Sequence, residues 1–310
     1  MKSDVTVIMP TYRHAEFIVQ SLESVFGQTL QPDEIIVIND GSPDHTDQVI
    51  APYLNRIHYI RQENQGVAKA LNRAINISRT DYLLFLASDD WLDPAAIEVL
   101  RDILARHRGV GVAHANRLKV DEYMRPLPDG SVPHLGIYTD LPLMLTYYTT
   151  YTPAVMCRRD AILESGPVPE YRYCQDWALW ISVALSGWHF YGTPEILGYY
   201  RRHPGNTSCL EFLEETTTDE ISMLQQFVHS GRLSPCLIPV AEEAIRYRRK
   251  VLAWELIRKG RRAQAARLFT DIGRDRTDFN TLLGLTASAL PTPLLQLTKM
   301  ARSGLGRQSL

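Results

Sequence analysis

Short apolar runs alternate with segments of helical spacing through the first 117 residues of the chain. The runs predict strands at 5–9, 35–38, 57–60, 82–86 and 110–115, and the segments between them predict helices at 16–26, 44–54, 67–77 and 94–106. Strands that alternate with helices usually pair in parallel, because each helix returns the chain across the sheet in a right-handed crossover. The pattern therefore predicts an α/β fold whose mainly parallel sheet is covered by helices on both faces.

The pattern becomes irregular after residue 117 and later turns helical. A helix is expected at 176–186, and residues from about 215 to 272 look helical around a break at Gly260 that indicates a hairpin. Residues 279–298 carry no charge, but two prolines and several polar residues make them a poor membrane span. We expect an interfacial or partner-bound segment there.

The composition is that of a globular protein with an uneven distribution of charge. The chain has 310 residues, of which 45% are hydrophobic, enough for one large domain with an appendage. Residues 241–310 hold 14 Lys or Arg against 6 Asp or Glu, a net charge of +8, which leaves −10 on the remainder. The basic end could face solvent, an anionic membrane or an acidic partner, with solvent as the default.

The spacing of the cysteines and the residues at the amino terminus give information on the cellular compartment of the protein. Neither a zinc site nor a disulfide framework is predicted, because close pairs are absent among the four cysteines, Cys157, Cys174, Cys209 and Cys236. The first strand is not preceded by a charged stretch and an apolar stretch, which argues against a signal peptide. These features predict a cytoplasmic protein.

Two adjacent carboxylates end the apolar run at 83–86. A buried parallel strand presents ligand sites at its carboxyl end, so Asp89 and Asp90 are expected where a ligand binds. The alternative role of a helix cap fits Asp93 better, because Pro94 follows it at the first helical position. Crowded carboxylates repel unless a cation or hydrogen-bond donors compensate, so a divalent metal that holds a phosphate is the natural interpretation.

Polar residues follow three other predicted strands in the same way. They are Pro10-Thr11-Tyr12-Arg13, then Asn39-Asp40-Gly41-Ser42, then Asn64-Gln65-Gly66 leading to Lys69 and Asn72. Asp40 could accept hydrogen bonds from a base or ribose, and Gly66 with Lys69 could approach a phosphate. Because the carboxyl ends of parallel strands share one edge of a sheet, these segments predict a single cleft.

The same segments argue against two other nucleotide-binding classes. A dinucleotide-dependent dehydrogenase requires G-x-G-x-x-G after the first strand, where this chain has Met9-Pro10-Thr11-Tyr12. A sugar nucleotidyltransferase would carry a glycine-rich loop with arginine at that place, which this chain lacks.

Taken in order, the segments resemble an inverting glycosyltransferase of family 2 with the GT-A fold. The resemblance covers residues 4–208 and rests on Pro10-Thr11-Tyr12-Arg13, Asn39-Asp40-Gly41-Ser42, Asn64-x-Gly66-x-x-x-Ala70-x-Asn72, Asp89-Asp90, Gln175-Asp176-Trp177-x-Leu179-Trp180 and Arg202-His203. It implies a glycosyltransferase domain at 1–208, with a nucleotide-sugar half at 1–117 and an acceptor half at 118–208. A helical carboxyl-terminal extension at 209–310 follows.

The resemblance also implies roles for single residues. Asp176 matches the family's general base. Asp90 would bind Mn²⁺ or Mg²⁺, with His203 as a weaker candidate at the metal or diphosphate. Asp89 would lie near both the ribose and the metal. The nucleotide sugar would be bound by Pro10, Thr11, Tyr12, Arg13, Asp40, Gly66, Lys69, Asn72, Ser88 and Asp89.

The implied activity is metal-dependent transfer of a sugar, with inversion, from a nucleoside diphosphate sugar. UDP is the expected nucleotide, the acceptor is a hydroxyl of a glycan or lipid-linked molecule, and the expected context is bacterial-type polysaccharide biosynthesis for the cell envelope. Nucleic acid is not an expected partner. Residues 209–310 would contact the inner face of a membrane or a protein partner.

The chain departs from the family pattern where acids or bases are usual. Asn39 and Gln175 replace acids, Ala87 and Ser88 add no carboxylate before the pair, and Leu71 stands at an often basic position. Fewer acids lower the expected metal affinity. A non-catalytic module that binds a sugar nucleotide or glycan therefore remains the alternative, although Asp40, Asp90 and Asp176 are retained and activity is expected.

Overall fold

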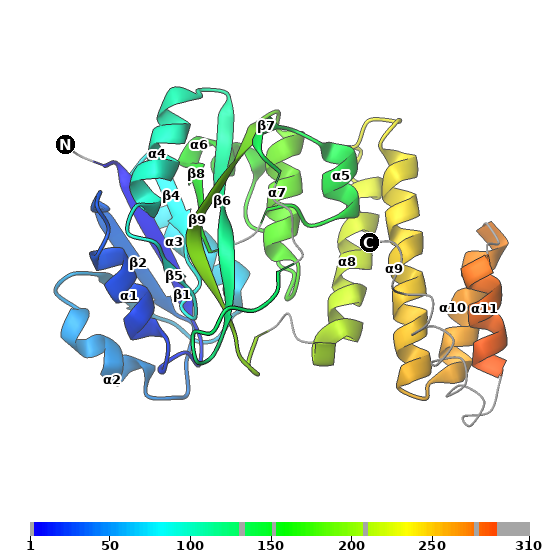
Figure 1. Ribbon diagram of the computed structural model, residues 1–310. Coiled ribbons are helices and arrows are strands. Elements are labelled where there is room, and N and C mark those ends of the chain that lie inside the picture. Colours follow the sequence, from blue (N-terminus) through cyan, green and yellow to red (C-terminus); the bar gives the residue numbers. More distant parts are fainter. Residues whose placement is uncertain (1–2, 130–133, 151–152, 207–209, 276–278, 290–310) are drawn as a thin grey trace. The chain divides into compact units, whose positions relative to one another are not determined.

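The chain forms two compact units, Met1–Asn206 and Thr207–Leu310. The computed structural model describes residues 3–129, 134–150, 153–206, 210–275 and 279–289. Figure 1 shows a sheet flanked by helices in the first unit and helices alone in the second.

Four parallel strands form one half of the sheet. They are β1 (Val5–Thr11), β2 (Glu34–Asn39), β3 (His58–Arg61) and β4 (Tyr82–Phe85), in the spatial order β3-β2-β1-β4. Each lies within a residue or two of its predicted position. The α/β class and the parallel arrangement expected for this part are confirmed.

The other half of the sheet is mixed. It contains β5 (Trp91–Leu92), β6 (Val110–Asp121), β7 (Gly136–Tyr138), β8 (Val155–Arg158) and β9 (His189–Arg202). Strand β8 pairs antiparallel with β4 and β6, β6 pairs parallel with β9, and β5 and β7 pair antiparallel with β9. The expectation of irregular structure after residue 117 was wrong here, because β6 continues to Asp121 and pairs with β9 along its length.

Seven α-helices and one 3₁₀ helix accompany the sheet among the residues described in this unit. They are α1 (Ile18–Phe26), α2 (Thr46–Ile50), η1 (Ala51–Tyr53), α3 (Val67–Ile77), α4 (Ala96–Arg106), α5 (Leu141–Thr146), α6 (Arg159–Ser165) and α7 (Gln175–Leu185). Helices α3 and α7 match their predictions closely. The segment expected to be one helix at 44–54 divides into α2 and η1.

Alternation along the strands divides the core between the two faces of the sheet. Val5, Val7 and Met9 of β1 pack with apolar residues of α1 and α4 in one buried cluster. Successive side chains of a strand point to opposite faces, so Ile8 faces the other side, where α3 contacts β1 and β2. Trp180 of α7 is buried among aromatic rings, including Phe85 at 6.1 Å between centroids. Helices therefore cover both faces, as expected.

The second unit consists of helices in its described part. They are η2 (Leu210–Phe212), α8 (Leu213–His229), α9 (Ile238–Arg258), α10 (Arg262–Asp275) and α11 (Phe279–Ala289). Gly260 ends α9 with a φ of +80°, a left-handed conformation that glycine adopts readily, and α10 folds back against α9. The predicted hairpin is confirmed. The end of the uncharged 279–298 segment, from residue 290, lies outside the described residues.

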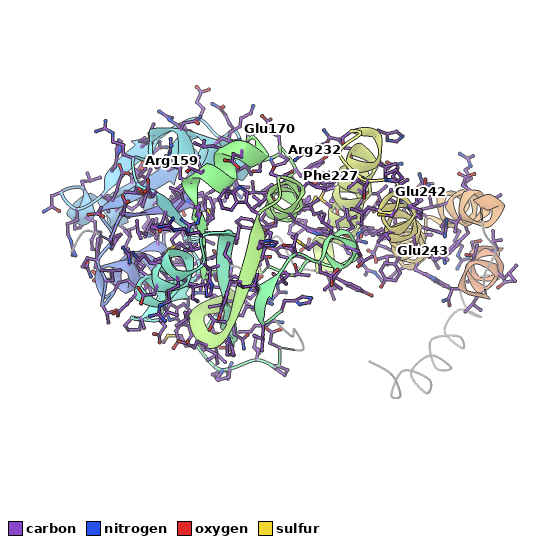
Figure 2. All side chains as sticks on the ribbon, turned by 90° about the horizontal axis from the view of Figure 1, so that it is seen from above. Arg159, Glu170, Phe227, Arg232, Glu242 and Glu243 are labelled. Carbon is purple, nitrogen blue, oxygen red and sulfur yellow. The ribbon has the colours of Figure 1, made fainter. Side chains whose placement is uncertain are left out.

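Several basic side chains of the second unit are paired with acids. Glu214 accepts hydrogen bonds from Lys259 and Arg261, Glu255 accepts from Arg258, and Glu243, which Figure 2 labels on α9, pairs with Arg246. No described helix combines the length and apolar composition needed to cross a bilayer. Contact of residues 209–310 with a membrane or a protein partner stays a prediction.

A glycine in β6 gives a test of how tightly the first unit is packed. A Cβ at Gly111 would lie 2.8 Å from Trp188 Cβ and 3.0 Å from Ala161 Cβ. We expect Gly111→Ala to lower the free energy of unfolding by about 1–3 kcal/mol through overpacking. Gly109→Ala is the matched control, because its Cβ would meet only His189 Cδ2 at 3.6 Å. Urea denaturation of both variants measures the difference, and equal stabilities would contradict the packing seen here.

Candidate active site

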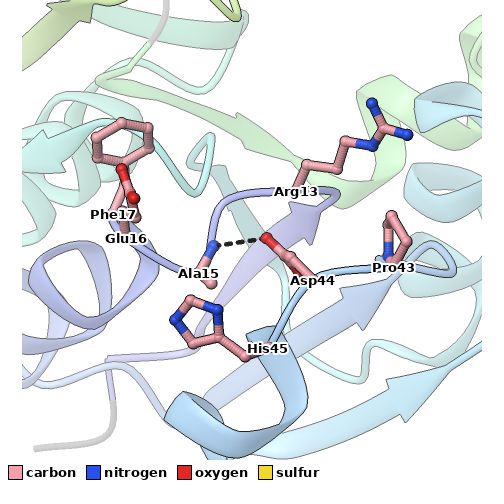
Figure 3. Close-up of a pocket in the computed structure, with 7 residues that line it drawn as sticks. All are labelled: Arg13, Ala15, Glu16, Phe17, Pro43, Asp44 and His45. Carbon is pink, nitrogen blue, oxygen red and sulfur yellow. Dashed lines mark hydrogen bonds between the residues drawn. The ribbon is translucent and has the colours of Figure 1, made fainter.

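The loops after β1, β2 and β4 are joined by hydrogen bonds at the carboxyl edge of the parallel strands. Arg13 donates its N–H to Ser42 Oγ at 3.1 Å, and Ala15 donates its N–H to Asp44 Oδ2 at 3.2 Å (Figure 3). His14 Nδ1 and Ser88 Oγ share a hydrogen bond of 2.8 Å. The convergence of strand-end loops predicted from the sequence is therefore present.

An open cavity of about 460 Å³ lies between the first two of these loops (Figure 3). Its lining consists of Arg13, Ala15, Glu16, Phe17, Pro43, Asp44 and His45. None of the acids predicted to bind a ligand lines it. Phe17 connects the cavity with the acid pair, because its ring lies 4.6 Å from that of His203, which bonds Asp89.

A row of polar side chains on α1 fixes the loop that carries the acid pair. Ser21 Oγ donates to the carbonyl oxygens of Ser88, at 2.9 Å, and Asp90. Ser24 of α1 and Gln28, which follows the end of this helix, bond the backbone after the acid pair. Ser21 and Gln28 are buried, and for Ser21 its place on the apolar face of the predicted helix is a signal for this role.

The two adjacent carboxyl groups have different environments. Burial and the neighbouring Asp89 raise the pKa of Asp90 well above its usual value. Burial also acts to raise the pKa of Asp89, but the hydrogen bond from His203 and the electrostatic effects of His14 and His203 lower it overall. Asp89 is therefore the carboxylate of the pair that is held ionised.

Asp90 binds protein groups rather than facing the histidines. Its Oδ1 accepts the backbone N–H of Arg201 at 2.9 Å, which attaches the end of β9 to this loop. The Arg201 side chain donates to the carbonyl oxygen of Asp89 and lies between the rings of Phe17 and Trp91, with Cζ 4.9 and 4.7 Å from their centroids. Sequence analysis did not identify Arg201, because its role depends on the missed pairing of β9.

Three side chains from distant parts of the chain form a group that could hold a metal ion. One possible ligand atom from each of His14, Asp89 and His203 lies within 4.8 Å of the others. His203 Nε2 is 3.1 Å from Asp89 Oδ2, and His14 Nδ1 is 3.9 Å from Asp89 Oδ1. Burial lowers the pKa of His14, which favours the neutral imidazole that binds metals. His14 was not predicted, and Asp90 does not join this group.

Backbone and amide groups orient the ligand atoms of this group. Gly205 donates its N–H to His203 Nδ1 at 3.2 Å, so the other ring nitrogen, Nε2, faces Asp89. Asn206 Nδ2 donates to Asp89 Oδ2 at 3.2 Å. The contact from Asn206 is of the kind that fixes the orientation of a metal ligand, whereas a metal at His203 Nε2 would require the ring proton on Nδ1 in place of the bond from Gly205.

Asp40 is engaged by the loop before α3. Its Oδ1 accepts from Gln65 N–H at 2.9 Å and from Gln62 Nε2 at 2.8 Å, and its Oδ2 accepts from Gly66 N–H at 2.8 Å. Gly41 follows with a φ of +72°, and a Cβ there would lie 2.8 Å from the backbone N of Asn64. Asp40 and Gly66 thus meet, as the sequence predicted, through a direct hydrogen bond.

Two residues predicted to bind the nucleotide lie against another loop. Asn72 donates from Nδ2 to Val168 O at 3.0 Å and accepts Val168 N–H at Oδ1 at 2.8 Å. Lys69 Nζ lies 3.6 Å from Glu170, which Figure 2 labels. These contacts hold the loop before α7, and they give no indication of a ligand.

The residues at the end of β1 that were predicted to bind the nucleotide sugar differ in their exposure to solvent. Pro10 and Thr11 are the last residues of β1 and pair with β2. Thr11 is 2% exposed, and its Oγ1 has no hydrogen-bond partner among the described residues. Tyr12 is 38% exposed, and Arg13 has a φ of +61° that turns the chain into the loop. A buried hydroxyl without a partner is a plausible ligand contact.

Asp176 lies at the first turn of α7 and accepts two hydrogen bonds. Trp177 N–H donates to Oδ1 at 2.8 Å, and Tyr148 Oη donates to Oδ2 at 2.7 Å. Burial raises the pKa of Asp176, while the bond from Tyr148 acts in the opposite direction. The positive charge of Arg117, on β6, acts to lower the pKa of both Tyr148 and Asp90.

Comparison with known proteins agrees with this architecture. Residues 6–163 match the family model described as glycosyl transferase family 2. An uncharacterized glycosyltransferase of Rickettsia prowazekii, RP339, is 37% identical over 247 residues, which are 73% of this chain and 76% of that protein. The aligned part covers only 14%, 26% and 18% of three other curated relatives.

Solved structures show the same fold at low identity. S. aureus TarS in complex with UDP-GlcNAc has a TM-score of 0.59 at 19% identity, over 83% of this chain and 72% of that chain. Mannosyltransferase PcManGT from Pyrobaculum calidifontis, in complex with GDP-Man and Mn²⁺, has a TM-score of 0.60 at 16% identity, over 96% and 83%. The GT-A architecture expected from the sequence is confirmed, and on the family match and the relative at 37% identity, the chain belongs to glycosyl transferase family 2.

Proposed function

We propose that this chain transfers a sugar from a nucleoside diphosphate sugar to a hydroxyl of a glycan or lipid-linked acceptor, with metal dependence and inversion. The observation that carries the proposal is the meeting of an ionised Asp89 with His14 and His203 at the carboxyl edge of the parallel strands. Ligands of α/β proteins bind at this edge. Family membership and the nucleotide sugars bound by TarS and PcManGT support the same activity.

The nucleotide would lie over the ends of β1 and β2. Thr11 offers a buried hydroxyl without a partner among the described residues, and Asp40 is fixed by the loop that leads to Gly66. We assign the nucleotide-sugar half to 1–117 and the acceptor half to 118–208. TarS, whose complex holds UDP-GlcNAc, supports UDP as the nucleotide.

The residues present fit a divalent metal. Two imidazoles and one carboxylate are donors that Mn²⁺ accepts, whereas Mg²⁺ prefers oxygen ligands, so His14, Asp89 and His203 favour Mn²⁺. A metal bound there would supply positive charge that neutralises the diphosphate as it leaves. Asp90 would affect the metal site indirectly. It holds the backbone of Arg201, and with it the end of β9, in place.

Asp176 would remove the proton from the acceptor hydroxyl. A sugar hydroxyl is a poor nucleophile, and a carboxylate within hydrogen-bond reach can accept its proton as it attacks the anomeric carbon. Attack from the face opposite the diphosphate breaks one bond as the other forms and inverts the anomeric centre. This route leaves no covalent sugar on the protein.

A ligand screen tests the function as a whole. We expect a nucleoside diphosphate or its sugar to raise the melting temperature, and more so with Mn²⁺, because a ligand at 100 times its Kd adds about 2.7 kcal/mol to stability. The screen compares the full chain with uridine, guanosine, adenosine, cytidine and thymidine diphosphates and their sugars. A chain that none of them stabilises would not fit the proposal.

Removing the proposed base should stop transfer without weakening donor binding. Asp176→Asn keeps an oxygen that can accept from Tyr148 or Trp177 N–H, but it cannot take a proton, so we expect kcat to fall by roughly 10²–10⁴-fold. Release of nucleoside diphosphate from the donor found in the screen measures turnover, and calorimetry measures donor binding. Asp160→Asn, an exposed acid in the first turn of α6, is the control. Unchanged turnover in Asp176→Asn would remove Asp176 from this role.

The adjacent acids should differ in their effect on metal binding. Asp89→Asn should weaken Mn²⁺ binding by more than the roughly 10–100-fold that loss of an outer contact costs. Asp90→Asn should change it little, because the raised pKa makes a neutral amide a close substitute and Oδ1 still accepts Arg201 N–H. Electron paramagnetic resonance of the free Mn²⁺ that remains in solution measures metal binding, and the nucleotide sugar is left out of the sample.

A histidine pair completes this comparison. His14→Ala should weaken Mn²⁺ binding, whereas His45→Ala, in the neighbouring loop and outside the group, should not. If Asp90→Asn weakened binding and Asp89→Asn did not, the assignment of the metal to Asp90 would stand instead.

A further inference from the structure

Tyr148 is the side chain that contacts the proposed base. It follows α5, and its hydroxyl donates to Asp176 Oδ2 at 2.7 Å. The backbone N–H of Trp177 occupies the other oxygen at 2.8 Å. Because both carboxylate oxygens have a donor, the plane of the carboxylate is fixed before any acceptor arrives.

The half-buried Tyr148 side chain lies between the segment after α5 and helix α7. Its ring lies 6.3 Å from that of Trp177, and Trp180, one turn after Asp176 on α7, acts on the same hydroxyl and lowers its pKa. Burial and the negative charge of Asp176 outweigh this and raise the pKa of Tyr148 well above its usual value. The phenol therefore stays protonated and remains a donor through the range in which Asp176 titrates.

We propose that Tyr148 is the positioning residue for the general base: its hydrogen bond orients the Asp176 carboxylate and extends the range of pH in which that carboxylate can accept a proton. This inference rests on the proposed function, because it assumes that Asp176 is the base. Tyr148 itself need not touch the sugar.

The direction in which Tyr148 shifts the pKa of Asp176 follows from the negative charge of the carboxylate that accepts its hydrogen bond. A hydroxyl that donates to a carboxylate stabilises the ionised form and lowers its pKa, against the burial that raises it. A base works only when deprotonated, so activity is present above this pKa and is lost as pH falls through it. Without the hydroxyl, the loss should begin at a higher pH.

Charged groups on the surrounding elements include Arg117 of β6, whose positive charge acts to lower the pKa of Tyr148 and whose Nε donates to Asp129 Oδ2 at 2.9 Å. Helix α5 carries no titratable side chain. On α6, Asp160 acts on Asp81, and Glu164 accepts from Trp188 Nε1 at 2.8 Å. Tyr148 is thus the titratable group whose hydrogen bond bears on Asp176.

The test compares Tyr148→Phe with Tyr147→Phe over a range of pH. Tyr147 is the adjacent tyrosine and is 64% exposed, so it controls for loss of a hydroxyl in this segment. A hydrogen bond to a charged group corresponds to about one to two pH units, so the acid limb of kcat/KM should move upward by that amount in Tyr148→Phe. Activity below the limb should fall by roughly 10–100-fold, and at high pH it should recover to within a few-fold of the unaltered protein. Tyr147→Phe should leave the limb in place.

A second measurement does not depend on turnover. The ¹³Cγ resonance of Asp176, assigned by its absence in Asp176→Asn, should titrate at higher pH in Tyr148→Phe than in the unaltered chain. Incorporation of 3-fluorotyrosine at 148, a stronger donor of nearly the same shape, should move it the other way and covers the case that Tyr148→Phe folds poorly.

The outcomes separate this inference from the proposed function. Equal loss of kcat at every pH, with an unchanged Asp176 titration, would mean that Tyr148 only packs, and the inference would be overturned. An Asp176 titration that shifts as expected, together with full turnover in Asp176→Asn, would keep the hydrogen bond but reject Asp176 as the base.

Discussion

The site depends on two carboxyl groups placed side by side at the buried end of a strand. Burial and repulsion disfavour two charges there, and the chain resolves this by separating their pKa values, with that of Asp90 raised and that of Asp89 lowered. The surrounding groups follow from this constraint. Ser21 holds the backbone carbonyl oxygens of the loop, Arg201 attaches β9 to it, and His203 donates to the carboxylate that remains ionised.

Hydrophobic periodicity sufficed for the first half of the fold and failed in the second for a physical reason. Up to Arg106 spacing predicts the elements within a few residues, apart from the two-residue β5 and the division of 44–54 into α2 and η1. Strand β9 contains Gly192, Pro194 and Gly198 and is half buried, so it shows no periodic pattern. Strand β9 exists because β6 pairs with it along eleven positions, with register shifts, and such long-range pairing is not encoded locally.

The candidate site divides in the same way. The residues after β1, β2 and β4 could be predicted, because parallel strands end at one edge and the chain there is polar. The contact of His14 with Ser88 and that of Tyr148 with Asp176 could not be predicted, since each joins residues more than 25 positions apart in the sequence. Lys69 and Asn72 had the local pattern of ligand contacts, yet the structure places them against the loop at 166–170. The local sequence pattern identified the polar residues at the carboxyl edge of the parallel strands, but it did not determine what each of them binds.

Hydrogen-bond donors decide what each carboxyl group of the site can do. Asp90 accepts the backbone N–H of Arg201, through which it holds the end of β9, and its charged neighbour Asp89 raises its pKa. Asp89 receives donors from His203 and Asn206, which keep it ionised as a ligand must be. Asp176 combines burial, which makes it more basic, with the Tyr148 hydroxyl, which keeps it ionised. Environments that push the pKa values of similar groups apart would let one type of side chain supply both the proposed metal ligand and the proposed base.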